Sequence, residues 1–486
     1  MSGQTMAVRK RRIALAVIAA AQFMVIMDTS IIGVALPEMQ RDLGFAAQDL
    51  SWVFNAYVVA FGGLLLLGGR LSDLFGARRM FATGWTVLGA GSLLAGLAGN
   101  VAVELTGRAV QGAGAALIAP AALTLLITIF GHDPREMTKA LALYGAAAPA
   151  GGTAGVFLGG VITEYLSWPW VFFINLPLVI AVLMVTPKVM PAGASRRGNL
   201  DVAGALTVTL GLGAVVFAVV RAPDSGWSAS TLAAGAVGLL LLAVFVVLQA
   251  QRRDPLMRLS IFRAPNLAAA NTAQLLLGAA WIPMFFFLNL YLQQVLGLGA
   301  FASGAALLPL TVTIMIGMIA IAPRLIAAFG PKAMTVAGLA TLAGGLLWLS
   351  FIRSEGSFVA DVLPASLLTA AGMAMAFIPS LGLALSAAAP EDGGLASGIV
   401  NTSYQIGSAL GLAAVAAVAA SQGGDRLGDL GALTDGFSAA FLVAAGIALV
   451  GAVLAVVTLR SAGRPAPAAE EDSAEAGVSA PASGGA

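Results

Sequence analysis

Long apolar stretches are the feature of this sequence that most limits what it can fold into. Fourteen runs of about 20 mainly apolar residues follow one another along the 486-residue chain, each long enough to cross a bilayer as a helix. Charged residues make up 10% of the chain, whereas about a quarter of a soluble domain is charged. Because lipid offers the backbone no hydrogen-bond partners, each run must be helical. We therefore predict an all-α polytopic membrane protein with fourteen transmembrane helices.

The predicted helices follow these apolar runs. They span residues 13–36, 50–69, 80–99, 103–130, 138–163, 169–187, 200–220, 230–249, 266–294, 302–323, 332–352, 361–388, 395–420 and 436–459. The basic segment 1–12 precedes them, and we expect it to be a cytoplasmic N-terminal tail. Residues 461–486 are rich in Ala, Pro, Ser, Gly and Glu and nearly lack large apolar side chains, which predicts a disordered cytoplasmic tail.

The positions of the 25 lysine and arginine residues indicate the orientation. With the N-terminus inside, fourteen helices place most of these residues in inner segments, as the positive-inside rule requires. The exceptions are Arg108, within a helix, and Arg41, Arg221, Arg353 and Arg426, in outer segments. We therefore predict a multi-pass protein of the bacterial inner (plasma) membrane with both termini in the cytoplasm.

An internal repeat indicates how the helices are organised. Residues 70–80 read RLSDLFGARRM and residues 324–334 read RLIAAFGPKAM, an offset of 254 residues. Parallel repeats are a common way of building transporters. The offset spans eight predicted helices, where two six-helix halves would give six, so two helices are inserted. We predict a six-helix bundle over 13–187, an inserted helix pair with flanking cytoplasmic loops over 188–265, and a second six-helix bundle over 266–460.

Asp28 and Arg108 lie deep inside predicted helices. A carboxylate at membrane depth, such as Asp28, is a functional candidate by default, and burial favours its protonated form. From the helical rise, Asp28 and Arg108 lie about 12 Å and 8 Å below the outer ends of their helices, so they could share a level. Arg108 could equally pair with Glu104, one turn earlier on its own helix. Gln111 shares the Arg108 face and could extend this polar patch.

The predicted helices of the second half contain no deep acid, so we assign the proton chemistry to the first half and substrate contacts largely to the second. Polar and aromatic residues at helical spacing mark candidate cavity faces there. With Gln111 from the first half, the substrate-cavity candidates are Asn271, Gln274, Trp281, Phe285, Asn401 and Gln405. The alternative for the amides is hydrogen bonding between helices, which is equally common in membranes.

Several function classes have little support in this composition. The chain has no cysteine and one histidine, His132, which excludes a Cys/His metal site, and we expect no metal and no cofactor. A membrane enzyme would need clustered carboxylates or a catalytic histidine, so we do not expect an enzyme. The basic residues are spread among inner loops, which gives no support to nucleic-acid binding. The expected partners are a small-molecule substrate, protons and the lipid bilayer, and we expect a monomer.

Several motifs are specific enough to indicate a family. The segment GGRLSDLFGARR (68–79) is similar to the signature loop between helices 2 and 3 of the major facilitator superfamily. MDTSIIGVALP (27–37), RAVQGAGAA (108–116) and GGTAGVFLGG (151–160) resemble motifs of helices 1, 4 and 5 in its fourteen-helix drug:proton antiporter branch. The matching signature-loop residues are Gly69, Asp73, Gly76, Arg78 and Arg79, and the helix 5 glycines are Gly151, Gly155, Gly159 and Gly160.

The resemblance implies roles for these residues. Asp28 becomes the acid of the helix 1 motif, Arg108 is linked to proton transfer, and the acid and bases of the signature loop form a charge network that holds one conformation. Three positions depart from the family pattern. Val156 follows Gly155 where the helix 5 motif usually has Pro, and Pro169 stands where the branch usually has Arg. In the second copy of the signature loop, Ala327 replaces the Asp.

The function that the resemblance implies is proton-coupled antiport by alternating access. The chain would export hydrophobic or cationic drug-like molecules, with the proton gradient as its energy source. Two alternatives remain within transport: export of one metabolite or self-made antibiotic, and uptake. A polytopic membrane enzyme is the alternative from another class.

Overall fold

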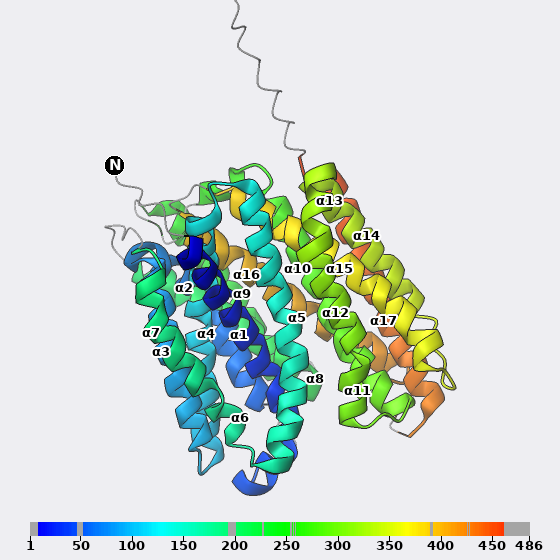
Figure 1. Ribbon diagram of the computed structural model, residues 1–486. Coiled ribbons are helices and arrows are strands. Elements are labelled where there is room, and N and C mark those ends of the chain that lie inside the picture. Colours follow the sequence, from blue (N-terminus) through cyan, green and yellow to red (C-terminus); the bar gives the residue numbers. More distant parts are fainter. Residues whose placement is uncertain are drawn as a thin grey trace, which may run out of the picture.

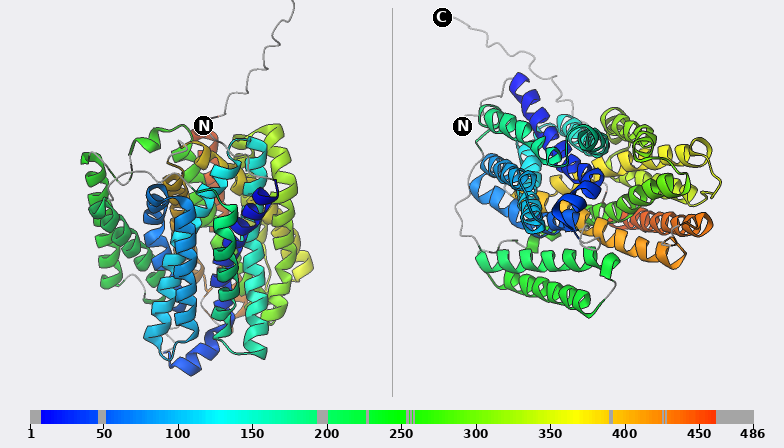
Figure 2. Two further views of the ribbon diagram at one scale, coloured as in Figure 1. Left: turned by 60° about the vertical axis from the view of Figure 1, so that its left-hand side comes forward. Right: turned by 90° about the horizontal axis from the view of Figure 1, so that it is seen from below.

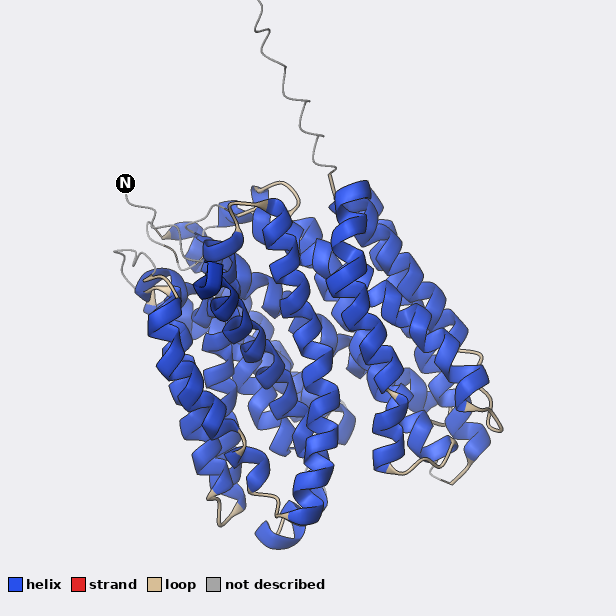
Figure 3. Ribbon diagram, viewed as in Figure 1, coloured by secondary structure: helices blue, strands red, loops and turns tan. Residues whose placement is uncertain are grey.

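The computed structural model describes residues 8–45, 52–192, 201–225, 228–252, 255, 257, 259–388, 392–424, 426 and 428–460. All regular elements in these ranges are helices (Figure 3). Among the described residues, twelve helices are long and apolar enough to cross a membrane. The chain is therefore an integral membrane protein with an all-helical fold. The predicted tail 461–486 and residues 1–7 lie outside the described residues.

The first group of helices occupies one side of the molecule (Figure 1). It comprises α1 (Val8–Leu43), α2 (Trp52–Phe75), α3 (Ala77–Gly96), α4 (Val101–Phe130), α5 (Pro134–Tyr165), α6 (Trp170–Phe173) and α7 (Asn175–Val189). Helix α1 packs along α5, α2 and α3 pack along α4, and α3 also packs on α7. This group buries α4 most deeply, so α4 is the place where polar side chains are most shielded from lipid.

The second group lies beside the first and repeats its pairings. It comprises α10 (Leu267–Leu290), α11 (Ala300–Ala306), α12 (Leu308–Ile316), α13 (Ala322–Phe329), α14 (Pro331–Leu349), α15 (Leu363–Ser386), α16 (Gly393–Ser421) and α17 (Leu430–Thr458). Short π-helical segments η3 (Tyr291–Val295), η4 (Gly317–Ile321) and η5 (Phe358–Val362) continue these helices. Helix α10 packs on α16 as α1 does on α5, and α14 packs on α15 and α17 as α3 does on α4 and α7.

The two remaining helices form a hairpin at the edge of the molecule (Figure 2). Helix α8 (Val202–Ser225) packs against α9 (Ala229–Gln251), and α8 also contacts α2 of the first group and α16 of the second. The short turn η2 (Leu259–Arg263) leads from this hairpin toward α10. The side chain of Asp201 accepts hydrogen bonds from Gln249 and from the backbone of Gly204, which fixes one end of the hairpin.

Two of the fourteen predicted spans are not among the twelve. Helix α3 covers the predicted span 80–99 but begins at Ala77, so Arg78 and Arg79 lie in its first turn and reduce its apolar character. Helix α8 covers most of the predicted span 200–220, and its described apolar stretch is Val202–Ala218. By length and composition alone, α3 is a marginal span.

Two predicted boundaries are corrected because polar contacts extend the helices. Helix α1 begins at Val8, before the predicted residue 13, so residues 8–12 are helical. Arg11 pairs with Glu136 and its guanidinium lies 5.1 Å from the centre of the Phe130 ring, which anchors this basic turn on the ends of α4 and α5. Helix α17 begins at Leu430, before the predicted residue 436, because the Asp429 side chain caps it by accepting from the Ala432 N–H (3.0 Å).

Candidate functional site

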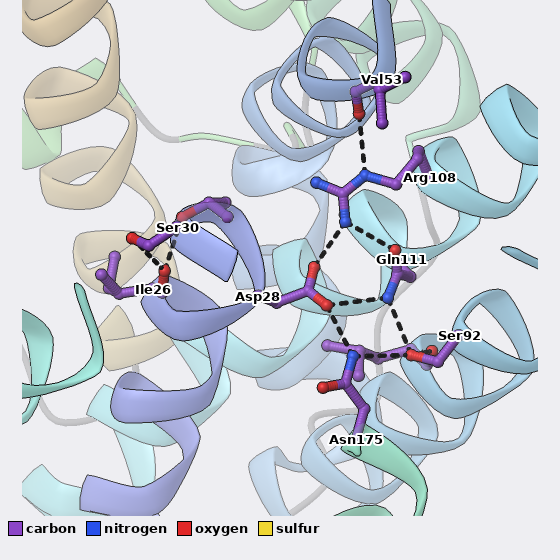
Figure 4. Close-up of polar contacts among 10 residues, drawn as sticks. Ile26, Asp28, Ser30, Val53, Ser92, Arg108, Gln111 and Asn175 are labelled. Atoms are coloured by element: carbon purple, nitrogen blue, oxygen red, sulfur yellow. Dashed lines mark hydrogen bonds and ion pairs between the residues drawn. The ribbon is translucent and has the colours of Figure 1, made fainter. Parts of the chain in front are cut away.

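A buried ion pair joins α1 to α4 (Figure 4). Arg108 Nη1 donates to Asp28 Oδ2 at 2.7 Å, and both side chains are fully buried. The predicted common level of these two residues is therefore a direct contact in the structure. Arg108 pairs with Asp28 and not with Glu104, whose two carboxylate oxygens have no hydrogen-bond partner among the described residues.

Neutral side chains complete the environment of the carboxylate. Asp28 Oδ1 accepts from Gln111 Nε2 at 3.0 Å and from Asn175 Nδ2 at 2.6 Å. Both amides also donate to Ser92 Oγ, at 2.8 Å from Gln111 and 3.1 Å from Asn175. Asp28 on α1 is thus bound by donors from α4 and α7, with Ser92 of α3 linking the two amides. Hydrogen bonds of this kind stabilise the charged form of a carboxylate.

Arg108 is itself held in a fixed position. Its Nε donates to the carbonyl oxygen of Val53 at 2.9 Å, and Nη1 also donates to Gln111 Oε1 at 2.7 Å. The guanidinium carbon lies 4.8 Å from the centre of the Tyr57 ring and 6.0 Å from that of Phe172. Aromatic faces attract a desolvated cation. In the described part of the chain, Nη2 has no acceptor, so Arg108 can donate at least one further hydrogen bond.

The local sequence explains why these groups meet. Asn100 caps the start of α4 by accepting from the Val103 N–H at 3.0 Å, which sets where the helix begins. Gly112 then lets α4 approach α2, because a Cβ atom there would lie 2.3 Å from the carbonyl oxygen of Tyr57. This approach brings Tyr57 over the guanidinium of Arg108.

The charges of Asp28 and Arg108 determine how the site responds to a proton. One carboxylate and one guanidinium form a neutral pair, which is the favourable way to bury either charge. Protonation of Asp28 would leave Arg108 without its counter-ion and would weaken the bonds that tie α1 to α4 and α7. Gain or loss of one proton can therefore change the packing of three helices.

The signature loop forms a second polar contact, between the two groups of helices. Asp73 Oδ1 and Oδ2 accept from the backbone N–H groups of Gly394 (2.8 Å) and Leu395 (3.0 Å), in the first turn of α16. A carboxylate at a helix N-terminus is stabilised by the unpaired N–H groups and the helix dipole. Gly69 allows the close approach, because a Cβ atom there would lie 2.5 Å from the carbonyl oxygen of Gly394.

The basic residues of the loop lie apart from this contact. Arg78 is half-buried and donates to the carbonyl oxygen of Met190 at 3.3 Å, while Arg79 is exposed. Gly76 has a positive φ of 88° and forms the turn between α2 and α3. Among the described residues, Asp73 forms no ion pair with either arginine. The resemblance implied a network of charges in this loop, whereas in the structure the Asp73 carboxylate binds the N-terminus of α16.

The helix 5 glycines lie against α1. Cβ atoms at Gly151, Gly155 and Gly159 would lie 2.2, 2.8 and 2.8 Å from the carbonyl oxygens of Phe23, Met27 and Ile31, respectively. Gly160, expected on the same face, has no such neighbour within 4 Å. A residue next to Gly159 is turned by about 100° around the helix and therefore faces elsewhere.

The second-half cavity candidates separate into two sets. Asn271 donates to Leu267 O at 2.8 Å and accepts from Ser403, and Gln274 donates to Ser380 Oγ at 3.0 Å and to Phe377 O. These two amides join helices. Trp281 is buried in the apolar core, whereas Phe285, Asn401 and Gln405 are half-buried. Gln111, the first-half candidate, belongs to the Asp28 site.

Three residues of the site, Asn175, Ser92 and Tyr57, were not predicted. Asn175 could have been predicted from the sequence, since a lone amide in the apolar run FFINLP must find a hydrogen-bond partner inside the protein. Ser92 and Tyr57 could not have been predicted as site residues, because both residue types are common in membrane helices.

Comparison with known proteins gives a consistent picture. The family model of the Major Facilitator Superfamily matches residues 18–412 and 324–484. The cephamycin export protein of Amycolatopsis lactamdurans is 37% identical over 94% of both chains. The puromycin resistance protein of Streptomyces alboniger is 36% identical over 92% of this chain and 91% of that protein. The tetracenomycin C resistance and export protein of Streptomyces glaucescens is 31% identical over 85% of this chain and 76% of that protein.

Solved structures share the fold at low identity. The human organic anion transporter MFSD10 superimposes with a TM-score of 0.68 at 16% identity, over 92% of this chain and 99% of that one. The proton:xylose symporter XylE superimposes with a TM-score of 0.67 at 14% identity, over 93% and 96% of the two chains.

Proposed function

Because this chain belongs to the major facilitator superfamily, we propose that it is a proton-driven exporter of antibiotic-like small molecules. The observation that carries the proposal is the buried ion pair between Asp28 and Arg108, a group that can gain and lose one proton inside the membrane. Relatives named for cephamycin export, puromycin resistance and tetracenomycin export support the direction and the substrate class. The protein is a transporter and not an enzyme.

The proposal includes the finer architecture. Helices α3 and α8 cross the bilayer with the other twelve, which gives two six-helix bundles, 13–187 and 266–460, and an inserted pair within 188–265. The N-terminal end of α1 and the C-terminal end of α17 lie at the same end of the molecule (Figure 1), as an even number of crossings requires. We assign that end to the cytoplasm of a bacterial cell because the loops at that end carry most of the lysine and arginine residues. The transporter acts as a monomer and uses no cofactor.

The mechanism is alternating access. In this conformation Asp73 of α2 binds the first turn of α16, which closes the cytoplasmic ends of the two bundles. A proton from outside reaches Asp28, Arg108 loses its counter-ion, and the bonds between α1 and α4 weaken. Substrate then enters from the cytoplasm once the bundles rock open on that side. Proton release to the cytoplasm restores the ion pair and favours the conformation described here.

A continuous set of contacts leads from the proton site to the other bundle. Asp28 is on α1, and α1 packs on the glycine face of α5. From α5, Thr153 forms a hydrogen bond with Thr311 of α12 (2.7 Å), and Val156 lies beside Gly304 of α11. A shift of α1 is therefore transmitted to a surface that both bundles share.

Uptake by inverted membrane vesicles tests the proposal. Vesicles with an imposed proton gradient, acidic inside, should accumulate puromycin or ethidium, and Asp28→Asn should abolish accumulation at an equal amount of inserted protein. Glu355→Gln, which changes an exposed loop acid, is the matched control and should transport normally. Accumulation that is unaffected by collapsing the gradient, or by Asp28→Asn, would refute proton coupling.

A dedicated exporter of one self-made antibiotic is the second candidate. The names of three relatives each specify a single antibiotic, which favours a narrow substrate range. Expression in an efflux-deficient bacterium separates the two candidates: a broad exporter raises resistance to unrelated compounds, and a dedicated one to a single chemical class.

A further inference from the structure

A second acid lies next to the ion pair without a partner. Glu104 is fully buried in the first part of α4, one helical turn before Arg108. Within the described residues, neither of its carboxylate oxygens receives a hydrogen bond. A buried ionised carboxylate without donors is strongly unfavourable, whereas its protonated form is tolerated. Glu104 therefore carries a proton in this conformation.

The charges around Glu104 support the same assignment. Asp28 from α1 and Arg108 from α4 are the charged groups that act on it, and Tyr57 of α2 is a neutral phenol beside them. One guanidinium can neutralise one carboxylate, and here it pairs with Asp28. Helix α16, which also packs on α4, contains no acid or base within its bounds. The other charged residues of the helices packed on α4 lie toward helix ends: Arg9, Lys10, Arg11, Arg12, Glu38, Arg41, Asp42, Arg70, Asp73, Arg78, Arg79, Arg135, Glu136, Lys139 and Glu164.

The geometry also gives Arg108 an alternative partner. Residues four apart on a helix are neighbours, so the guanidinium of Arg108 can reach Glu104 after a change of side-chain rotamer. Its Nη2 has no acceptor among the described residues and is available for that contact. Glu104 is also nearer than Arg108 to the end of α4 that starts at Val101, the outer end in the proposed orientation.

We propose that Glu104 is the proton-relay group through which an external proton reaches Asp28. The O–H bond of the Glu104 carboxyl breaks, the Asp28 carboxylate takes the proton, and Arg108 moves its ion pair from Asp28 to Glu104. One ionised acid and one guanidinium are present before and after the step, so the buried cluster stays neutral. A proton from outside then neutralises Glu104 again, which frees Arg108 to return when Asp28 releases its proton inside. The relay rests on the proposed proton coupling.

Infrared difference spectroscopy tests the protonation state directly. Wild-type protein in lipid, titrated from acidic to alkaline pH, should show the C=O stretch of a protonated carboxyl group near neutral pH. The band should be absent in Glu104→Gln, and also in Asp28→Asn, because Arg108 without Asp28 pairs with an ionised Glu104. The lipid-facing variant Thr106→Val, on the same turn of α4, should leave the band unchanged. A Glu104→Gln spectrum identical to that of the wild type would overturn the proposal.

Transport measurements separate the relay from the proposed function. Puromycin exchange across vesicles without a gradient should persist in Glu104→Gln, whereas gradient-driven uptake should fall about tenfold and recover in Glu104→Asp. If Asp28→Asn abolishes gradient-driven uptake and Glu104→Gln does not alter it, the relay is wrong and proton-driven export stands. If neither variant alters it, proton-driven export itself is wrong.

Discussion

Removing both members of the Asp28–Arg108 pair should destabilise the protein by less than the sum of the two single removals. Both side chains are fully buried, and Arg108 donates three hydrogen bonds, to Asp28, Gln111 and Val53. Breaking a buried pair on one side costs about 3–5 kcal/mol because an uncompensated charge remains. We expect a loss of this size for Arg108→Gln, which leaves the Asp28 carboxylate without its counter-ion, and a smaller loss for Asp28→Asn, where Arg108 can turn to Glu104. The double variant buries no charge, so its loss should fall short of the sum by about 2–3 kcal/mol.

Equilibrium unfolding of the detergent-solubilised protein, followed by tryptophan fluorescence, measures these four free energies. The ion pair between Arg353 and Asp361 is a matched control, because the Arg353 side chain is 68% exposed. Breaking that pair should cost about 1 kcal/mol or less, with little coupling between the two substitutions. Additivity at Asp28 and Arg108 to within about 0.5 kcal/mol would refute the reasoning, since independent sites behave in that way.

Three further predictions follow from contacts between helices. Asp73→Asn should weaken both bonds to α16 and favour the conformation open to the cytoplasm, which spin-label distances across the inner ends of α2 and α16 would detect. Gly407→Ala should lower the unfolding free energy by about 1–3 kcal/mol, because its Cβ would lie 1.9 Å from the carbonyl oxygen of Leu275. Gly446→Ala, with no neighbour within 4 Å of its Cβ, should be neutral in the same unfolding assay. Gln274→Leu should lower the unfolding free energy by about 1 kcal/mol through lost bonds between helices. Gln405→Leu should instead alter puromycin and ethidium uptake with little change in unfolding.

The contact between Asp28 and Arg108 could be predicted because it depends on regular geometry. Helices that start and end at the two faces of a membrane rise by 1.5 Å per residue, so depth follows from counting. The choice between Asp28 and Glu104 could not be made in that way. Both acids lie within reach of Arg108, and the arrangement of α1 against α4 decides which one it meets.

The contact of Asp73 with α16 was beyond prediction from spacing. The partners are separated by 321 residues and belong to different groups of helices. Periodicity within a helix carries no information about a contact between two such groups. For the same reason, the amides of Asn271 and Gln274 could be predicted to face the protein interior, but not whether they face a cavity or another helix.

The partner of Asp73 consists of main-chain amides, and this has an evolutionary consequence. Substituting Leu395 does not remove its N–H group unless proline is introduced, whereas a Cβ atom at Gly394 would lie 2.3 Å from Asp73 Oδ1. Selection for this contact therefore falls on Asp73 and on the glycines Gly69 and Gly394, while the rest of α16 can vary without removing it. A transporter built in this way can acquire resistance to new compounds without losing its ability to close.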